Sequence, residues 1–183
     1  MTTSTTPTTQ KPCALPELPA ELRNRIHRYT LCQEGILRIT KGNFQHPSLL
    51  RTCQQIRNEA SGIFYQESEI SFRLHDFNPD VALSFNKHRP SHWGPARVDF
   101  GKNPTSWTNF LSLMRAVFED EVVAMGTIDD DKTIQGTRKT AWNVAAAAAH
   151  MISKLEDAGG SWNDAVEVLG HYKVATEPLI HWT

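Results

Sequence analysis

Apolar side chains recur at helical intervals in several short segments, and the clearest case lies in residues 48–63. There the side chains spaced four, three, four and three residues apart are Leu49, Cys53, Ile56, Ala60 and Ile63. Residues three and four positions apart share one face of an α-helix. The pattern therefore predicts a helix that begins at Pro47-Ser48 and buries this face, with Gly62 near its end.

Another amphipathic helix is predicted to begin near Pro19. Proline fits the first turn of a helix, and Glu21 then lies where the helix dipole favours an acidic side chain. The apolar stripe of this helix consists of Leu18, Leu22, Ile26 and Tyr29. The basic residues that fall mostly off the stripe are Arg23, Arg25 and Arg28. We therefore expect an amphipathic helix with a basic outer side.

Three short strands are expected between and after these helices. Apolar and polar residues alternate over residues 70–74, which is typical of a half-buried strand. Residues 35–40 are predicted to form a strand that can pair with it, followed by a turn at residues 41–43, and residues 96–100 to form a third strand. A short helix beginning at Asn78-Pro79 carries Val81, Ala82 and Phe85.

The last third of the chain is predicted to be mainly helical. A helix that begins at residues 103–105 presents an apolar face of Trp107, Phe110, Leu111, Met114 and Val117 or Phe118. After a strand candidate at residues 122–128, a helix runs from Thr140 through an alanine tract to Gly159-Gly160. Ser161 and Asp164 form a cap signature for a last helix that ends near Gly170, followed by a tail.

This order of elements predicts an α+β domain rather than a regular α/β repeat. We expect residues 1–14, which are rich in threonine, to be a disordered tail. Residues 15–183 then form a single domain, in which a helical module with a strand insertion (15–74) packs against a helical and strand region (75–183). The 39% of hydrophobic residues, including five Trp and eight Phe, can form a sizeable core.

Charge is divided unevenly along the chain. Residues 1–102 carry thirteen basic and nine acidic residues, a balance of +4, and residues 103–183 carry six and eleven, a balance of −5. The total of −1 does not favour nucleic acid or an anionic membrane as a partner. We find neither a signal peptide nor a run of apolar residues long enough to span a bilayer, so we expect a cytoplasmic or nuclear protein.

No residue pattern predicts an active site or a metal site. His88 and His92 have the spacing of metal ligands on a helix, but Pro90 between them disfavours that helix. The three aspartates at residues 129–131 point in different directions in an extended loop, so we expect a solvated acidic loop. We therefore expect a protein that is not an enzyme and that has no cofactor.

The cysteines are odd in number and widely spaced, so a disulfide framework is not expected. Cys32 and Cys53 fall at apolar helix positions, and a free cysteine behaves as a small buried hydrophobe. Both are therefore predicted to lie in the core.

Residues 15–72 resemble a known interaction module. The chain reads LPELPAELRNRI from Leu15, and LLRTCQQIRNEASGIFY from Leu49. These motifs resemble the F-box-like segment of filamentous-fungal proteins, including the two-EXR domain family. The first E-x-R of that family matches Glu21 to Arg23, whereas Gln55 replaces the glutamate of the second.

The resemblance implies a protein that binds other proteins, as a substrate receptor or adaptor of a cullin ubiquitin ligase. An F-box engages a Skp-type adaptor through apolar helix faces. The residues that would make this contact here are Leu15, Pro16, Leu22 and Ile26, with Leu50, Cys53 and Ile56 as their counterparts on the second helix. The EXR residues would instead brace the module through ion pairs among Glu21, Arg23, Arg57 and Glu59.

Two other functions stay open from the sequence. One is a ligand-binding or accessory protein of fungal secondary metabolism or host interaction, with an aromatic-lined pocket near Trp93, Trp107 or Trp142. The other is a small hydrolase or isomerase. Docking to an adaptor requires Leu22 and Ile26 to be exposed, whereas burial of both against Cys53 and Ile56 would make the module part of the core.

Overall fold

The computed structural model describes residues 15–32, 35–40, 45–87, 96–101, 103–122 and 136–183. Several predicted features lie outside these residues. They are the tail at residues 1–14, the turn at 41–43, the loop with His88, His92 and Trp93, the acidic loop at 129–131, and all but the first residue of the strand candidate at 122–128.

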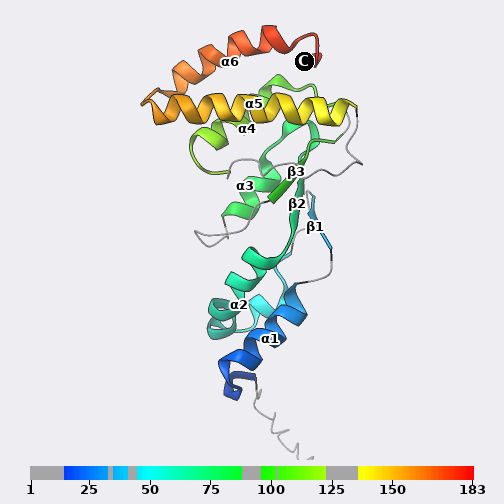
Figure 1. Ribbon diagram of the computed structural model, residues 1–183, viewed down its shortest axis with the longest axis vertical. Helices are drawn as coiled ribbons and strands as arrows, with labels where there is room; N and C mark the ends of the chain where they lie inside the picture. Colours follow the sequence, from blue (N-terminus) through cyan, green and yellow to red (C-terminus); the bar gives the residue numbers. More distant parts are fainter. Residues whose placement is uncertain (1–14, 33–34, 41–44, 88–95, 102, 123–135) are drawn as a thin grey trace, which may run out of the picture.

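The described residues form an elongated α+β structure with three tiers, as predicted for the fold class (Figure 1). Two helices, α1 (Ala20–Leu31) and α2 (Gln54–Glu67), make up the first tier. The sheet and α3 (Asp80–Asn86) form the middle tier. The far tier consists of α4 (Trp107–Phe118), α5 (Thr137–Asp157) and α6 (Trp162–Thr176).

The sheet has three parallel strands in the order β1 (Leu37–Ile39), β2 (Ile70–Arg73) and β3 (Ala96–Asp99). The predicted pairing of the first two strands is confirmed, with Ile39 opposite Phe72. Parallel pairing follows because α2 connects β1 to β2 and α3 lies between β2 and β3, and parallel neighbours need such a crossover. Buried side chains of the sheet join a core that continues through all three tiers.

The predicted helix at residues 47–63 is divided in two. A 3-10 helix, η2 (Ser48–Arg51), ends at Thr52, whose hydroxyl donates to the carbonyl of Leu49 (2.7 Å), and Cys53 is extended at the start of α2. A threonine side chain that bonds to the backbone in this way competes with a continuous helix. Cys53 is therefore exposed, so its predicted burial is wrong, and Gly62 lies inside α2 rather than near its end.

The far tier confirms the predicted cap of the last helix. The Ser161 hydroxyl accepts from the backbone N–H of Asp164 (3.3 Å), and the Asp164 carboxylate accepts in return from the N–H of Ser161 (2.7 Å). The helix then continues past Gly170 to Thr176, so the predicted end is wrong. Figure 1 shows α5 running across the long axis of the molecule, beside α6. Helix α5 packs on α4, and Ala145 and Ala148 of its alanine tract are buried.

The C-terminal residues are docked on α4. The backbone N–H of Trp107 donates to the carbonyl of Thr183 (3.1 Å), and the N–H of Thr183 donates to the carbonyl of Thr105 (2.9 Å). Trp182 is 9% exposed and its indole N–H donates to the hydroxyl of Thr176 (3.0 Å). Among the described residues, no helix is long and apolar enough to cross a membrane.

Candidate functional site

Arg23 holds α1 on α2. Its guanidinium makes a bidentate contact with the Glu59 carboxylate, through Nε and Nη2 at 2.8 Å each. It also donates to the carbonyls of Leu18 and, at 3.3 Å, Pro16. The hydrogen bonds with Arg23 lower the pKa of Glu59, and the same contact raises the pKa of Arg23. This arrangement joins the entry of α1 to the middle of α2.

The other two residues of the expected ion-pair group lie elsewhere. Glu21 is exposed, and its carboxylate has no hydrogen-bond partner among the described residues. Arg57 donates its Nε to the backbone carbonyl of Leu50 (2.9 Å), and no carboxylate of the described chain lies within ion-pair distance of it. The expected group is therefore reduced to the pair of Arg23 and Glu59.

His27 is the buried centre of the contact between α1 and α2. Its side chain is completely buried, one turn after Arg23 and one turn before the buried Leu31. Within the described part of the chain, neither ring nitrogen has a hydrogen-bond partner. Burial lowers the pKa of His27, and Arg23 adds to this while Glu59 opposes it. The inner face of α1 thus consists of Arg23, His27 and Leu31.

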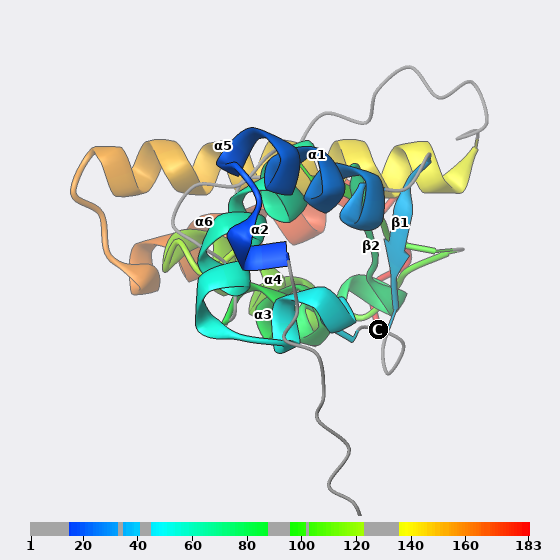
Figure 2. The ribbon, with the colours of Figure 1, turned by 90° about the horizontal axis from the view of Figure 1, so that it is seen from below.

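The predicted apolar stripe of α1 faces outward instead. Leu22 is 48% exposed, Ile26 40% and Tyr29 93%. The expectation that this stripe faces inward is therefore wrong. Arg25 and Arg28 are exposed, as expected for the outer side, whereas Arg23 lies on the inner face and meets α2. In the end-on view α1 lies beside α2 (Figure 2). We call the exposed side chains of Leu22, Ile26 and Tyr29 the α1 surface.

The remaining residues expected to bind a partner are not all on this surface. Pro16 is exposed and Leu15 is partly buried against the core. Leu50 and Ile56 are each 5% exposed, so they belong to the core and offer no contact area in this conformation. Of the residues expected to bind the partner, Leu22 and Ile26 on α1 are thus exposed. Among their counterparts on the second helix, Leu50 and Ile56 are buried and Cys53 is exposed.

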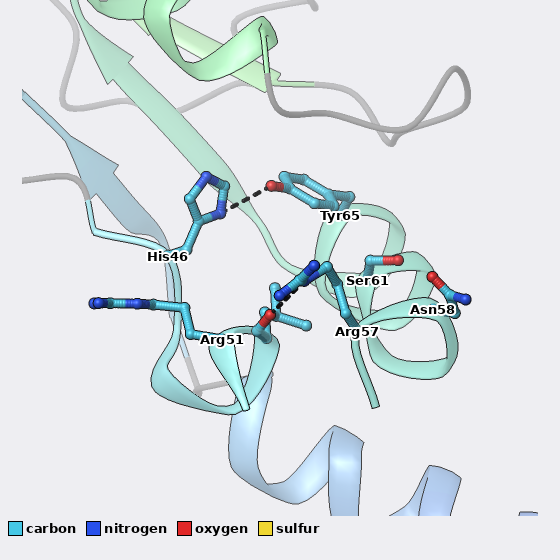
Figure 3. Close-up of a pocket in the computed structure, with 7 residues that line it drawn as sticks. His46, Arg51, Arg57, Asn58, Ser61 and Tyr65 are labelled. Carbon is cyan, nitrogen blue, oxygen red and sulfur yellow. Dashed lines mark hydrogen bonds between the residues drawn. The ribbon is translucent and has the colours of Figure 1, made fainter. Parts of the chain in front are cut away.

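In addition to the α1 surface, the tier that contains α1 and α2 has a basic pocket of about 630 Å³ between η2 and α2 (Figure 3). The described residues that line it are His46, Leu50, Arg51, Arg57, Asn58, Ser61 and Tyr65. The Tyr65 hydroxyl and His46 Nδ1 are 3.1 Å apart, and the two side chains form one wall of the pocket. Sequence reasoning missed this pocket, because His46 and the α2 residues come together only through folding.

Tyr65 is the deepest polar residue of the basic pocket. It is 2% exposed, and its ring meets those of Phe64 and Phe85 edge-on at centroid distances of 5.0 and 5.5 Å. Burial raises the pKa of Tyr65 to about 12. The hydroxyl therefore keeps its proton at neutral pH and can donate a hydrogen bond.

The tryptophans expected around a pocket take different places. Trp107 stacks on Phe110 at a centroid distance of 5.3 Å and meets Trp182 edge-on at 5.1 Å, so it belongs to an aromatic cluster beside the docked C-terminus. Trp142 is partly buried on α5, and its indole N–H has no partner among the described residues. Trp93 lies outside the described residues.

The described residues contain no group of three or more His, Cys, Asp or Glu side chains arranged to hold a metal ion. Cys32 is partly buried at the end of α1, which only partly agrees with its predicted burial, and this burial raises the pKa of its thiol. A thiol with a raised pKa is a weak nucleophile at neutral pH.

Comparisons of the chain with protein-family models, with curated proteins and with solved structures give no match.

Proposed function

We propose that the chain is a non-enzymatic protein-interaction protein that docks a partner on the α1 surface. The observation that carries this proposal is the exposure of Leu22, Ile26 and Tyr29 at intervals of four and three residues on one helix. Large apolar side chains gathered on one face are typical of a surface that a partner covers. An amphipathic helix presented in this way fits an apolar groove of another protein.

The attachment of α1 supports this role. Arg23 and Glu59 hold the helix from its inner face by a bidentate contact, which leaves the α1 surface on the opposite side. A helix that is already ordered loses little conformational freedom when it binds. Affinity then depends on the apolar area that the partner covers.

The partner that we propose is a Skp-type adaptor of a cullin ubiquitin ligase, acting in the cytoplasm or nucleus. This follows from the F-box-like motifs that begin at Leu15 and Leu49, and from the exposure of Leu22 and Ile26, which such docking requires. Because Leu50 and Ile56 are buried, the contact would be made by the α1 side alone. The rest of the chain would recruit the substrate.

The proposal is tested by calorimetric titration of the purified protein with a recombinant fungal Skp-type adaptor. We expect micromolar or tighter binding that is lost in the Leu22→Asp, Ile26→Asp double variant. Because both side chains are exposed, this variant should keep the circular dichroism spectrum of the wild type. The matched control is Leu179→Asp, an exposed leucine beyond α6, which should bind like the wild type.

Absence of binding by the wild-type protein would reject the adaptor as partner. Equal binding by the wild type and the double variant would reject the α1 surface as the docking site. A double variant that unfolds would show that Leu22 and Ile26 stabilise the fold, which contradicts their exposure and the proposal built on it.

A further inference from the structure

We infer that the basic pocket binds a small organic molecule through a phosphate or carboxylate group. The pocket lies between η2 and α2, and none of the α1 surface residues lines it. Its volume of about 630 Å³ lies within the range of roughly 300–1,000 Å³ that is usual for sites of organic ligands.

The charge of the pocket favours an anion. Of the seven described residues that line the pocket, Arg51 and Arg57 carry a guanidinium group and none is acidic. Glu59, which lies two residues after Arg57, is bound to Arg23 at the contact with α1. The carboxylate nearest in sequence to Arg57 is thus engaged elsewhere, and the two positive charges have no acidic counterpart among the described lining residues.

The hydrogen-bond donors of the pocket are available to a ligand. Arg57 uses its Nε for the carbonyl of Leu50 (2.9 Å), which orients the guanidinium and leaves its two terminal amino groups. The side chains of Arg51, Asn58 and Ser61 form no hydrogen bond with any described residue. Two amino groups of one guanidinium match the two oxygens of a carboxylate or phosphate, which makes this contact strong and directional.

The walls of the pocket suit the organic part of such a molecule. Leu50 and Tyr65 are 5% and 2% exposed, so the pocket reaches the apolar core at its base. Figure 3 shows His46 and Tyr65 on one side of the pocket, facing Arg57. Ser61 and Asn58 lie farther along, next to Arg57. A ligand with an acidic group near Arg57 can therefore place an apolar ring beside Leu50.

The test uses three simple anions and one neutral probe with the full-length protein. Phenyl phosphate, benzoate and inorganic phosphate are titrated by calorimetry at low salt, and benzyl alcohol serves as the uncharged analogue. We expect saturable binding of phenyl phosphate or benzoate below about 10 mM, and weaker binding of inorganic phosphate and benzyl alcohol. The tighter of the two aromatic anions identifies the acidic group that the pocket prefers.

Variants locate the binding. Arg51→Gln and Arg57→Gln should each raise the Kd at least about tenfold, since each removes a charged hydrogen-bond donor. The Arg51 side chain has no partner in the described chain, so the Arg51 variant should stay folded even if the loss of the Arg57 contact with Leu50 perturbs α2 in the other variant. Arg25→Gln is the matched control, because it removes the same charge from an exposed position on α1, outside the pocket. It should change the Kd by less than about twofold.

Three results would overturn the inference. The first is that neither aromatic anion shows saturable binding. The second is that Arg51→Gln and Arg25→Gln have equal Kd values, and the third is that benzyl alcohol binds with the same affinity as benzoate. The Leu22→Asp, Ile26→Asp variant should bind the anions like the wild type, so failure of the docking proposal and failure of this inference give different results.

Discussion

Replacing His27 with leucine should stabilise the protein. His27 is completely buried between α1 and α2, and neither of its ring nitrogens has a partner in the described residues. Leucine has a similar volume and carries no polar atoms. The substitution therefore removes the cost of burying an unpaired donor and an unpaired acceptor while it keeps the contact between the helices filled.

The expected gain follows from this unpaired burial. Leaving a buried polar group without a hydrogen bond costs about 1–3 kcal/mol. Part of the gain is offset because leucine has a different shape from imidazole, and imperfect shape in a packed core costs up to roughly 1.5 kcal/mol. We therefore expect the free energy of unfolding to rise by about 1 kcal/mol.

The pH dependence of stability gives a second readout. Burial lowers the pKa of His27 in the folded state below its ordinary value of 6.5, so the unfolded chain binds the proton more readily. The folded state is then stabilised above pH 6.5, and this stability is lost as the pH falls below that value. In His27→Leu this loss is absent, so the advantage of the variant should grow on acidification.

Urea unfolding monitored by circular dichroism at several pH values between about 5 and 8 measures both effects. The matched control is His171→Leu, which removes an exposed histidine from α6 and should change stability by less than about 0.5 kcal/mol. A His27→Leu variant that is clearly less stable than the wild type at pH 8 would refute the reasoning. It would mean that the imidazole makes a stabilising contact.

Three further predictions concern the attachment of elements. The single variants Arg23→Ala and Glu59→Ala should each lower the melting temperature, and the double variant should lower it by less than the sum of the two single effects. Arg28→Ala breaks the exposed pair with Glu67 and should have a smaller effect. Additive effects of Arg23→Ala and Glu59→Ala would contradict the paired contact. Trp182→Ala should cost about 3–5 kcal/mol in urea unfolding, because the indole is 9% exposed among aromatic rings, and a cost near zero would show that the C-terminus is not docked. Ser161→Ala should cost about 1 kcal/mol by removing one half of the cap of α6, and Ser161→Asp, which can also cap a helix, should restore most of it.

Local signals in the chain were enough to locate most elements. The start of α1 after Pro19, the alternation over β2 and the cap formed by Ser161 and Asp164 each involve residues within a few positions of one another. Such signals act through backbone geometry and nearest neighbours, so they can be read without the rest of the fold. The α+β class follows from the order of these elements.

The orientation of α1 could not be predicted in this way. Counting apolar side chains favours the face with Leu22 and Ile26 as the inner one. Arg23 reverses this result, because its charge is matched by Glu59, thirty-six residues away on α2. A polar residue becomes an inner residue only when its partner is in place, and the partner is brought there by the fold.

The same physical reason applies to the basic pocket. Arg57 and Tyr65 lie on α2 eight residues apart, whereas His46 comes from the segment before η2 and meets Tyr65 at 3.1 Å. Sequence spacing predicts which residues share a helix face, but it contains no information on which segment packs opposite that face. The elements and their class thus come from local chemistry, while the exposed face of α1 and the set of groups around the pocket depend on contacts between distant segments.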